Sequence, residues 1–451
     1  MLTNRTRRGR IRALASAVAG ILLVGVAAGP SYAADSTRSQ QWHLDAMHAE
    51  EMWKTSTGEG IKVAVIDTGV DPNNPDLKGR VLDGLDLAGQ FQKGDEHTDY
   101  EGHGTGMAGL IAGTGAWGGG KGAFGLAPGS KIIPVRMPGK NDLLGFAGPD
   151  YLTKAIRYAA DSGAQIINIS MGTIAHTPAL DQAVRHALDR GTLIFAAVGN
   201  DAEKGNLPEY PAATPGVVGV GSVGKNLHRS SFSQYGPQVD MAAPGEEIVS
   251  ACGEKSGLCI GDGSSAATAL ASASAALIWS KHPDWTNNQV LRVMLNTIGG
   301  PTDGAKRNDS IGYGIVRPRI ALQNPGDPGP ADVYPLPDLK EAEKTASPSP
   351  TASKSGEAGA PVKGDDTDAN ASAAEDSGSN TLWIVIGAGA AVLLVAAVAA
   401  FAISRKRRSQ LPPPPPPGMP MQQTPYGGWQ FTQPGPDAVP ENNPYNPGRP
   451  Q

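Results

Sequence analysis

The sequence predicts an α/β protein built on a doubly wound, mainly parallel sheet with helices on both faces, followed by one C-terminal transmembrane helix. Short apolar runs alternate with helical stretches between residues 61 and 197, which is typical of strands and crossover helices in a parallel sheet. Residues 382–403 form an uncharged run of 22 residues, long enough to span about 30 Å of hydrocarbon. A segment rich in Pro, Ala, Ser and acidic residues separates the two parts.

The first 33 residues are predicted to be a cleaved secretory signal peptide. Five arginines and no acid precede an apolar run at 13–28, and Ser31-Tyr32-Ala33 supplies the small residues that a signal peptidase needs. The alternative is an uncleaved membrane anchor, but the apolar stretch is short and ends in a cleavage pattern. Residues 34–60 are then an N-terminal extension that precedes the first strand.

Four short apolar runs and three helical stretches organise the next part of the chain. Such runs predict buried strands, and residues with helical periodicity predict the crossovers between them. The expected strands are 61–66, 131–135, 165–169 and 192–197, and the expected helices are 104–113, 149–162 and 177–190. Because ligand chemistry in parallel α/β sheets gathers at the carboxyl ends of the strands, the residues that follow these runs are the first candidates for a site.

The C-terminal part is predicted to be a stalk, a membrane span and a tail. Residues 323–380 have almost no large apolar side chain after Leu339 and are predicted to be disordered. The transmembrane helix at 381–403 is followed at once by a basic cluster at 405–408, which holds the tail 404–451 in the cytoplasm and the rest of the chain outside. A run of six consecutive prolines at 412–417 in that tail indicates either a polyproline ligand or an inert low-complexity tail.

The charge balance of the chain argues against a nucleic-acid-binding protein. Residues 35–403 hold 28 Lys and Arg against 41 Asp and Glu, so this part offers no basic face for a nucleic acid. We expect no cofactor, because the Gly-rich string at 113–118 follows a predicted helix, whereas a dinucleotide fingerprint follows a strand. We also expect no metal site, since no carboxylate cluster has a diagnostic spacing, although calcium stays open.

Two cysteines, Cys252 and Cys259, lie in the one predicted globular domain at 35–322. In an extracytoplasmic compartment disulfides persist, and six intervening residues make a small loop that a disulfide can close. The alternative is a pair of free thiols. A metal site is disfavoured because two cysteines without a paired histidine supply too few ligands.

Three side chains stand out as candidates for nucleophilic catalysis. Asp67 directly follows a buried strand, where a carboxylate can be held rigidly to orient an imidazole, although turn aspartates are also common there. His103 lies between glycines in Gly102-His103-Gly104, which lets backbone and substrate approach closely. Ser265 lies at the start of a small-residue helix, where free N–H groups favour developing negative charge, although a helix N-cap is the alternative.

A fourth side chain completes the pattern. Asn200 follows another expected strand and can donate its side-chain amide to an oxyanion. With Asp, His, Asn and Ser in this order, residues 40–320 resemble the subtilisin-like serine proteases. The resemblance implies that Ser265 is the nucleophile, His103 the general base and then acid, Asp67 its orienting partner and Asn200 an oxyanion donor. It further implies a peptidase domain at 61–322.

The resemblance also implies how a substrate binds. Peptides would extend along Ser170, Met171 and Gly172 as a further β-strand, and Met171 hints at an apolar wall of the cleft. The usual Gly-Thr-Ser-Met-Ala-x-Pro motif appears here as the string Gly-Ser-Ser-Ala-Ala-Thr-Ala that begins at Gly263. Two adjacent serines therefore compete for the nucleophile role. We prefer Ser265, because only that register also aligns Gly263 and Ala267.

The whole layout is similar to the mycosins, membrane-anchored subtilases of actinobacterial type VII secretion. This resemblance implies a single-pass membrane protease, with its catalytic domain outside the cell membrane, that acts on proteins or peptides and associates with a secretion complex. It also implies that 34–60 is a short extension wrapping the domain, because the segment is too short for a folded prodomain. The alternative function is a structural subunit of a secretion complex in which proteolysis is incidental.

Overall fold

The computed structural model describes residues 36–138, 148–252 and 258–346. Chain contacts define two units, and all described residues belong to the unit formed by 1–347 and 427–451. The predicted signal peptide, transmembrane helix and tail lie outside the described residues. Within the part that is described, no helix combines the length and apolar character needed to cross a bilayer.

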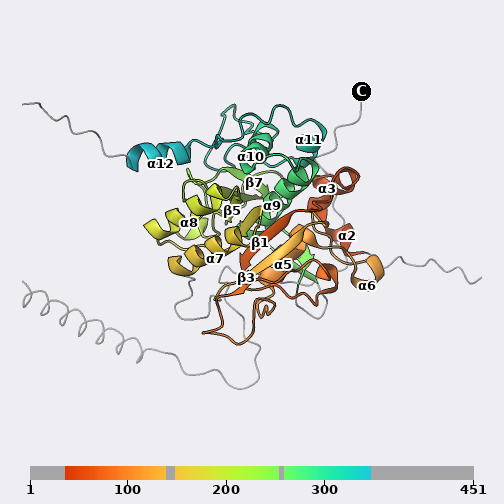
Figure 1. Cartoon of the computed structure of the whole chain (residues 1–451). Coiled ribbons are helices and arrows are strands. Elements are labelled where there is room, and N and C mark those ends of the chain that lie inside the picture. The colour runs from red at the N-terminus through yellow and green to blue at the C-terminus, as the bar shows by residue number, and fades with distance from the viewer. Residues whose placement is uncertain (1–35, 139–147, 253–257, 347–451) are drawn as a thin grey trace, which may run out of the picture. The chain divides into compact units, whose positions relative to one another are not determined.

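A parallel sheet of seven strands forms the centre of the described structure, as the sequence predicts (Figure 1). Its strand order is β2-β3-β1-β4-β5-β6-β7, and every neighbouring pair is parallel. The strands are β1 (Lys62–Asp67), β2 (Leu85–Asp86), β3 (Lys131–Arg136), β4 (Ile166–Ile169), β5 (Leu193–Ala197), β6 (Val218–Val223) and β7 (Met241–Pro244). Four of them, β1, β3, β4 and β5, lie within a residue of the expected runs.

Helices cover both faces of the sheet, and alternate residues of β1 and β5 belong to different cores. Val63 and Val65 of β1 pack in one core with α5 (His103–Ala112), α9 (Ser264–Lys281), α10 (Asn287–Asn296) and α11 (Pro318–Gln323). Ala64 and Ile66 face the other, with α7 (Pro149–Asp161) and α8 (Pro178–Asp189). Burial on both faces explains why the strands are continuous apolar runs.

Helix α9 runs through the middle of the larger core. Its residues are buried almost all round from Ser264 to Trp279, and most of them are Ala, Ser or Thr. Small side chains let a helix approach the sheet and α5 closely, so this composition suits a central position. The first turn of α9 is thereby held firmly against the carboxyl edge of the sheet.

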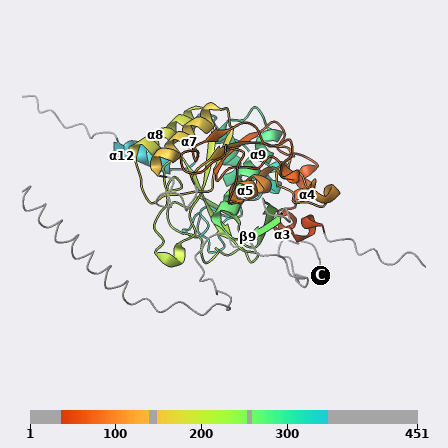
Figure 2. The same cartoon turned by 90° about the horizontal axis from the view of Figure 1, so that it is seen from below.

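The N-terminal extension packs against the domain through three short helices, α2 (Thr37–Gln40), α3 (Trp42–Ala46) and α4 (Ala49–Trp53). The buried amide of Gln41 donates to the carbonyls of Phe124 and Val249, and the indole of Trp42 donates to the carbonyl of Glu246. Gln41 thereby joins the start of α3 to β8 (Ile248–Ala251), which pairs with β9 (Leu258–Gly261) in a two-stranded hairpin. Both α3 and β9 are labelled in Figure 2. The extension therefore packs against the domain next to β8.

His43 of this extension is fully buried, and neither ring nitrogen has a hydrogen-bond partner among the described residues. Burial, with a smaller contribution from Arg38, lowers the pKa of His43 to about 3. The unfolded chain takes up this proton near pH 6.5, so between pH 6.5 and 3 the unfolded state binds more protons. The free energy of unfolding should therefore fall as the pH falls, by up to about 1.4 kcal/mol per pH unit.

We accordingly expect His43→Leu to gain stability relative to the unmodified protein as the pH is lowered from 7 to 4. The measurement is the midpoint of thermal unfolding against pH for both proteins. His228→Gln, at an exposed histidine, is the matched control and should leave the pH dependence unchanged. Parallel curves for His43→Leu and the unmodified protein would contradict this assignment.

The packed chain continues beyond residue 322, where the sequence predicts a disordered stalk. The guanidinium of Arg292 donates to the carbonyls of Pro328 and Pro330 at 2.6 and 2.9 Å. Leu336 is buried in the larger core, and helix α12 (Asp338–Ala346) begins with a carboxylate that accepts from the backbone of Gly216. The predicted boundary at residue 322 is therefore too early, since the described packed chain runs on to Ala346, where backbone carbonyls of a Pro-rich segment are satisfied by an arginine of the domain.

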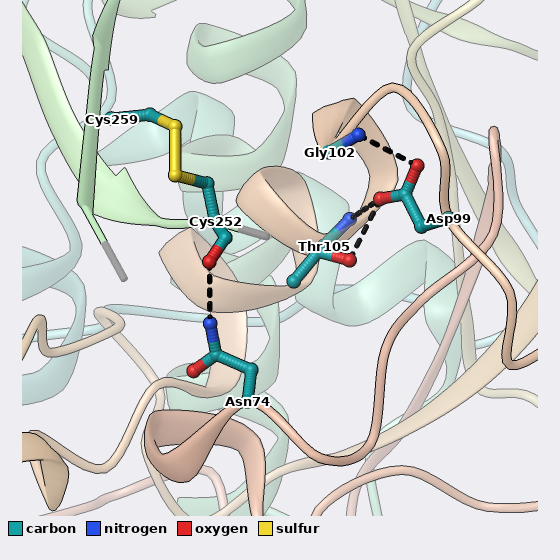
Figure 3. Close-up of a disulfide and its surroundings, with 6 residues drawn as sticks. All are labelled: Asn74, Asp99, Gly102, Thr105, Cys252 and Cys259. Atoms are coloured by element: carbon teal, nitrogen blue, oxygen red, sulfur yellow. Dashed lines mark hydrogen bonds between the residues drawn. A yellow bond between two sulfur atoms is a disulfide. The ribbon is translucent and has the colours of Figure 1, made fainter. Parts of the chain in front are cut away.

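The predicted disulfide is present between Cys252 and Cys259. It joins the ends of the β8–β9 hairpin, and the side-chain amide of Asn74 donates to the carbonyl of Cys252 at 2.8 Å (Figure 3). Strand β9 leads within two residues to Gly263 and α9. The covalent loop closure therefore limits the freedom of the chain just before the helix that carries Ser265.

Candidate active site

Asp67 and His103 form a close pair at the carboxyl edge of the sheet. Asp67 is the last residue of β1 and is fully buried, and its Oδ1 lies 2.7 Å from Nδ1 of His103. Gly104 permits this approach, since a Cβ there would lie 2.1 Å from the carbonyl oxygen of Gly69. A glycine beside the histidine is thus required for α5 to begin directly over the end of β1.

The turn before His103 is organised by a second carboxylate, Asp99. Its Oδ1 accepts from the backbone of Gly102 at 2.8 Å, and its Oδ2 accepts from the backbone and hydroxyl of Thr105 at 2.8 and 2.7 Å (Figure 3). Thr68, next to Asp67, also donates to Oδ1 of Asp99. Burial, and to a lesser degree the charge of Asp67, raises the pKa of Asp99. Sequence reasoning missed this residue, although an acid just before a helix start is a recognisable signal.

Ser265 lies in the first turn of α9, at the same edge of the sheet. Its Oγ is 3.5 Å from the carbonyl oxygen of Ser170, which directly follows β4. Because Ile66 pairs with Ile169 in register, Asp67 and Ser170 leave the sheet at neighbouring positions. The fold therefore brings Ser265 to the edge that holds the Asp67–His103 pair.

Asn200 contacts the other serine of the motif. Its Oδ1 accepts from the backbone N–H and the hydroxyl of Ser264 at 2.8 and 2.9 Å, and Ser264 Oγ accepts from the backbone of Gly199 at 3.2 Å. With its oxygen engaged, the amide of Asn200 presents its NH₂ group as the donor. Ser264 is fully buried and its hydroxyl is committed to this turn, whereas Ser265 keeps 5% exposure. These contacts favour Ser265 as the nucleophile.

A buried polar network that sequence reasoning missed holds the segment beside Ser265. Asn168 of β4 donates to the hydroxyl of Ser170 at 3.0 Å, and Ser272 of α9 donates to Asn168 at 3.0 Å. Ser170 to Gly172 follow β4 without a strand partner among the described residues. The backbone of this segment is therefore rigidly placed and open for pairing, as binding of an extended peptide requires.

One group of possible metal ligands occurs in the described residues, formed by Asp83, Glu96 and His97. Asp83 is exposed, and Glu96 and His97 are half-buried. Oε1 of Glu96 already accepts from the backbone of Gly84, and Nε2 of His97 lies 3.1 Å from the carbonyl oxygen of Leu82. We assign no metal to it, since exposed acidic groups of this kind commonly occur without an ion.

Comparison with known proteins agrees with this geometry. A profile of the subtilase family matches residues 58–314. Thermitase of Thermoactinomyces vulgaris is 36% identical over 47% of this chain and 72% of its own length. Among solved structures, the MycP3 protease from the type VII (ESX-3) secretion system is 33% identical, with a TM-score of 0.55 over 62% of this chain and 87% of that one.

MycP1 from Mycobacterium smegmatis is also similar, at 28% identity and a TM-score of 0.54 over 65% of this chain and 86% of the other. The family match covers more than half of the chain and includes Asp67, His103, Asn200 and Ser265. The chain therefore belongs to the subtilase family of serine proteases, and its structural neighbours include the mycosin proteases of type VII secretion.

Proposed function

We propose that this protein is a membrane-anchored, extracytoplasmic serine endopeptidase that works through an acyl-enzyme on Ser265. The observation that supports this most directly is the 2.7 Å pair of Asp67 and His103 at the sheet edge to which Ser170 and α9 bring Ser265. An imidazole held through Nδ1 by a buried carboxylate presents Nε2 as a base, which is the arrangement that activates a serine hydroxyl.

In the first half-reaction, Ser265 Oγ attacks the carbonyl carbon of the scissile peptide bond while His103 Nε2 takes the hydroxyl proton. Asp67 keeps the imidazole in the correct tautomer and stabilises the imidazolium that forms. The tetrahedral intermediate collapses when His103 returns the proton to the leaving nitrogen, so the C–N bond breaks and an ester to Ser265 remains. Water then repeats the sequence, and the acid product leaves with Ser265 restored.

The oxyanion of each tetrahedral intermediate would be held by the Asn200 amide and the backbone N–H of Ser265. Ser264 anchors the oxygen of that amide, so the donor is oriented before the reaction begins. Pre-oriented donors in a site that excludes water cost no reorganisation when charge develops, and one such donor contributes about 10²- to 10³-fold in kcat. Ser264 is thus a positioning residue for Asn200.

The location and the partner are also part of this proposal. They are supported by the signal-like segment 1–33, the apolar run 381–403 and the basic residues that follow it. Similarity to MycP3 and MycP1 supports an association with a type VII secretion complex. The remaining domain assignments are a stalk up to 380 and a cytoplasmic tail at 404–451.

A second candidate function, that of a structural subunit of the complex, is favoured by one comparison. A MycP1 protease that is 29% identical to this chain is described as an essential component of the type VII (ESX-1) secretion system. Complementing a deletion strain with the Ser265→Ala variant and measuring secretion separates the two functions. Secretion that depends on the protein but survives this substitution would favour the structural role, whereas secretion lost in both strains would favour proteolysis.

Active-site labelling tests the proposed chemistry directly. We expect a fluorophosphonate to label the full-length protein in detergent, and mass spectrometry of the digested protein to place the adduct on Ser265. The variant Ser265→Ala should not be labelled. A folded protein that takes up no label, or an adduct on Ser264, would overturn the proposal.

A further inference from the structure

The side chain of Glu209 occupies the space next to two glycines of the candidate active site. A Cβ built on Gly172 would lie 2.3 Å from Oε2 of Glu209, and a Cβ built on Gly199 would lie 2.6 Å from Oε1. Nonbonded carbon atoms pack at about 3.5 to 4.0 Å, so neither position has room for one further carbon atom. Gly172 belongs to the segment that follows β4, and Gly199 directly precedes the oxyanion donor Asn200. The carboxylate thus fills the gap between these two parts of the site.

The fold holds Glu209 in this position at its backbone and at its carboxylate. The backbone carbonyl of Glu209 accepts from the N–H of Ala213 at 2.9 Å. Tyr210, the next residue, exchanges two backbone hydrogen bonds with Thr173, at 2.9 and 2.7 Å. At the other end of the side chain, Oε1 accepts from Nε2 of Gln234 at 3.0 Å, and Gln234 is 1% exposed. Displacing the carboxylate would therefore break a hydrogen bond to a buried amide.

Gln234 fills part of the same gap. Its Nε2 would lie 2.6 Å from a Cβ built on Gly199, and its backbone N–H donates to the carbonyl of Gly199 at 3.1 Å. The amide therefore lies against the same turn as the carboxylate that it binds. Two hydrogen-bonded polar side chains, Glu209 and Gln234, occupy the space that the glycine leaves.

A bound peptide would bring one of its side chains to this gap. Its reacting carbonyl has to lie between Ser265 and the Asn200 amide, and the residues before it have to extend along the segment that ends at Gly172. The side chain immediately before the scissile bond then leaves the peptide between this segment and the turn at Gly199. A large side chain there would meet the carboxylate of Glu209, whereas a hydrogen atom or a methyl group needs the least of this space.

Entry of a large side chain would carry two costs. Moving the carboxylate of Glu209 aside leaves the amide of Gln234 buried without its acceptor, which costs the desolvation of that donor. If the carboxylate stays in place, an apolar group against it removes water from a charge without compensation, and the crowded atoms add strain. A small side chain avoids both costs.

We propose that Glu209 is a specificity-determining residue that restricts the position immediately before the scissile bond to small residues, namely glycine, alanine and serine. The inference rests on the proposed function, because that function places the reacting carbonyl at Ser265. The selection is steric, since it depends on the volume that the side chain of Glu209 occupies. The substrates would then be proteins whose extended segments carry a small residue at the cleaved bond.

The test measures kcat/KM of the full-length protein for peptide amides that differ only in the residue before the scissile bond, which is Ala, Leu or Phe. We expect the unmodified protein to prefer Ala over Phe by about 10- to 100-fold, the range that overpacking produces. Glu209→Ala should raise the Phe-to-Ala ratio by about 10- to 100-fold, because the vacated space can bury an aromatic ring. Glu209→Gln keeps the volume and should leave the ratio within about threefold.

The matched control is Glu203→Ala, at an exposed position of the same loop, which should leave the ratio within about twofold. An unmodified protein that cleaves the Phe peptide as well as the Ala peptide would overturn the role of Glu209, and this comparison needs no variant. A rise of the ratio in Glu209→Gln equal to that in Glu209→Ala would also overturn it, because the volume is then not what selects.

Labelling by the fluorophosphonate separates the two levels of the proposal. A labelled protein without a preference for Ala, or a labelled Glu209→Ala variant with an unchanged ratio, would contradict the steric role and leave the peptidase proposal intact. A protein with no label and no hydrolysis of any of the three peptides would overturn both. A labelled Glu209→Ala variant with a raised Phe-to-Ala ratio would support the assignment, because the site is then assembled and only the selection has changed.

Discussion

Ser265→Ala is expected to lower kcat for peptide hydrolysis by about 10⁴- to 10⁶-fold, the largest effect of any single substitution in this protein. The reason is that the variant has no nucleophile for the acyl-enzyme, while Asp67, His103 and Asn200 stay in place. The residual rate comes from the oxyanion donors and from substrate binding alone. The measurement is steady-state hydrolysis of a fluorogenic peptide.

The matched control is the neighbouring serine. Ser264→Ala removes one of two hydrogen bonds that hold Oδ1 of Asn200, and the backbone N–H of residue 264 still donates to it. We therefore expect a loss of about 10-fold, which is small compared with removal of the oxyanion donor itself. If Ser264→Ala were inactive and Ser265→Ala retained turnover, the nucleophile would be the other serine.

Asp67→Asn is expected to lower kcat by about 10⁴-fold with little change in KM. An amide in place of the carboxylate can donate to Nδ1 of His103, which moves the imidazole proton to Nε2, the nitrogen that must act as the base. It also leaves the imidazolium without a counter-charge 2.7 Å away. The test is kcat and KM of both proteins over a range of pH.

The variant Asp99→Asn distinguishes two roles: Asp67 orients the imidazole of His103, whereas Asp99 supports the turn before α5. Asp99 accepts from backbone N–H groups and hydroxyls around the start of α5, so an NH₂ group at this position would face donors. We expect this variant to lose about 1–3 kcal/mol of stability. Asp67→Asn should instead unfold near the temperature of the unmodified protein.

An Asp67→Asn variant that keeps more than a tenth of the activity would contradict the role given to Asp67.

The predicted strands were found where the sequence has continuous apolar runs, because a strand buried on both faces needs an apolar side chain at nearly every position. Strands β6 and β7 escaped prediction. The string Val-Gly-Val-Gly-Ser-Val from Val218 and the string Met-Ala-Ala-Pro from Met241 contain small residues that pattern reasoning assigns to loops. They form strands because α9, itself built from small residues, packs against the sheet there.

The predicted end of the folded domain at residue 322 was too early for a similar reason. Residues 324–338 contain many Pro and Gly residues, and composition alone indicates that such a segment cannot pack. In the fold, the guanidinium of Arg292 and the backbone of Gly216 provide partners for it. The hydrogen bonds that order this segment come from residues more than 30 positions away.

The sequence by itself determined which residue types are available for the chemistry and in what order, because motifs such as Gly-His-Gly and Gly-Ser-Ser are local and carry their own backbone requirements. Only the tertiary structure decided how these residues face one another. Ser264 orients Asn200 across 64 positions, and Glu209 lies between Gly172 and Gly199. Such contacts depend on the order and register of the parallel strands, which arise from packing of the whole sheet and are encoded in no single stretch of the chain.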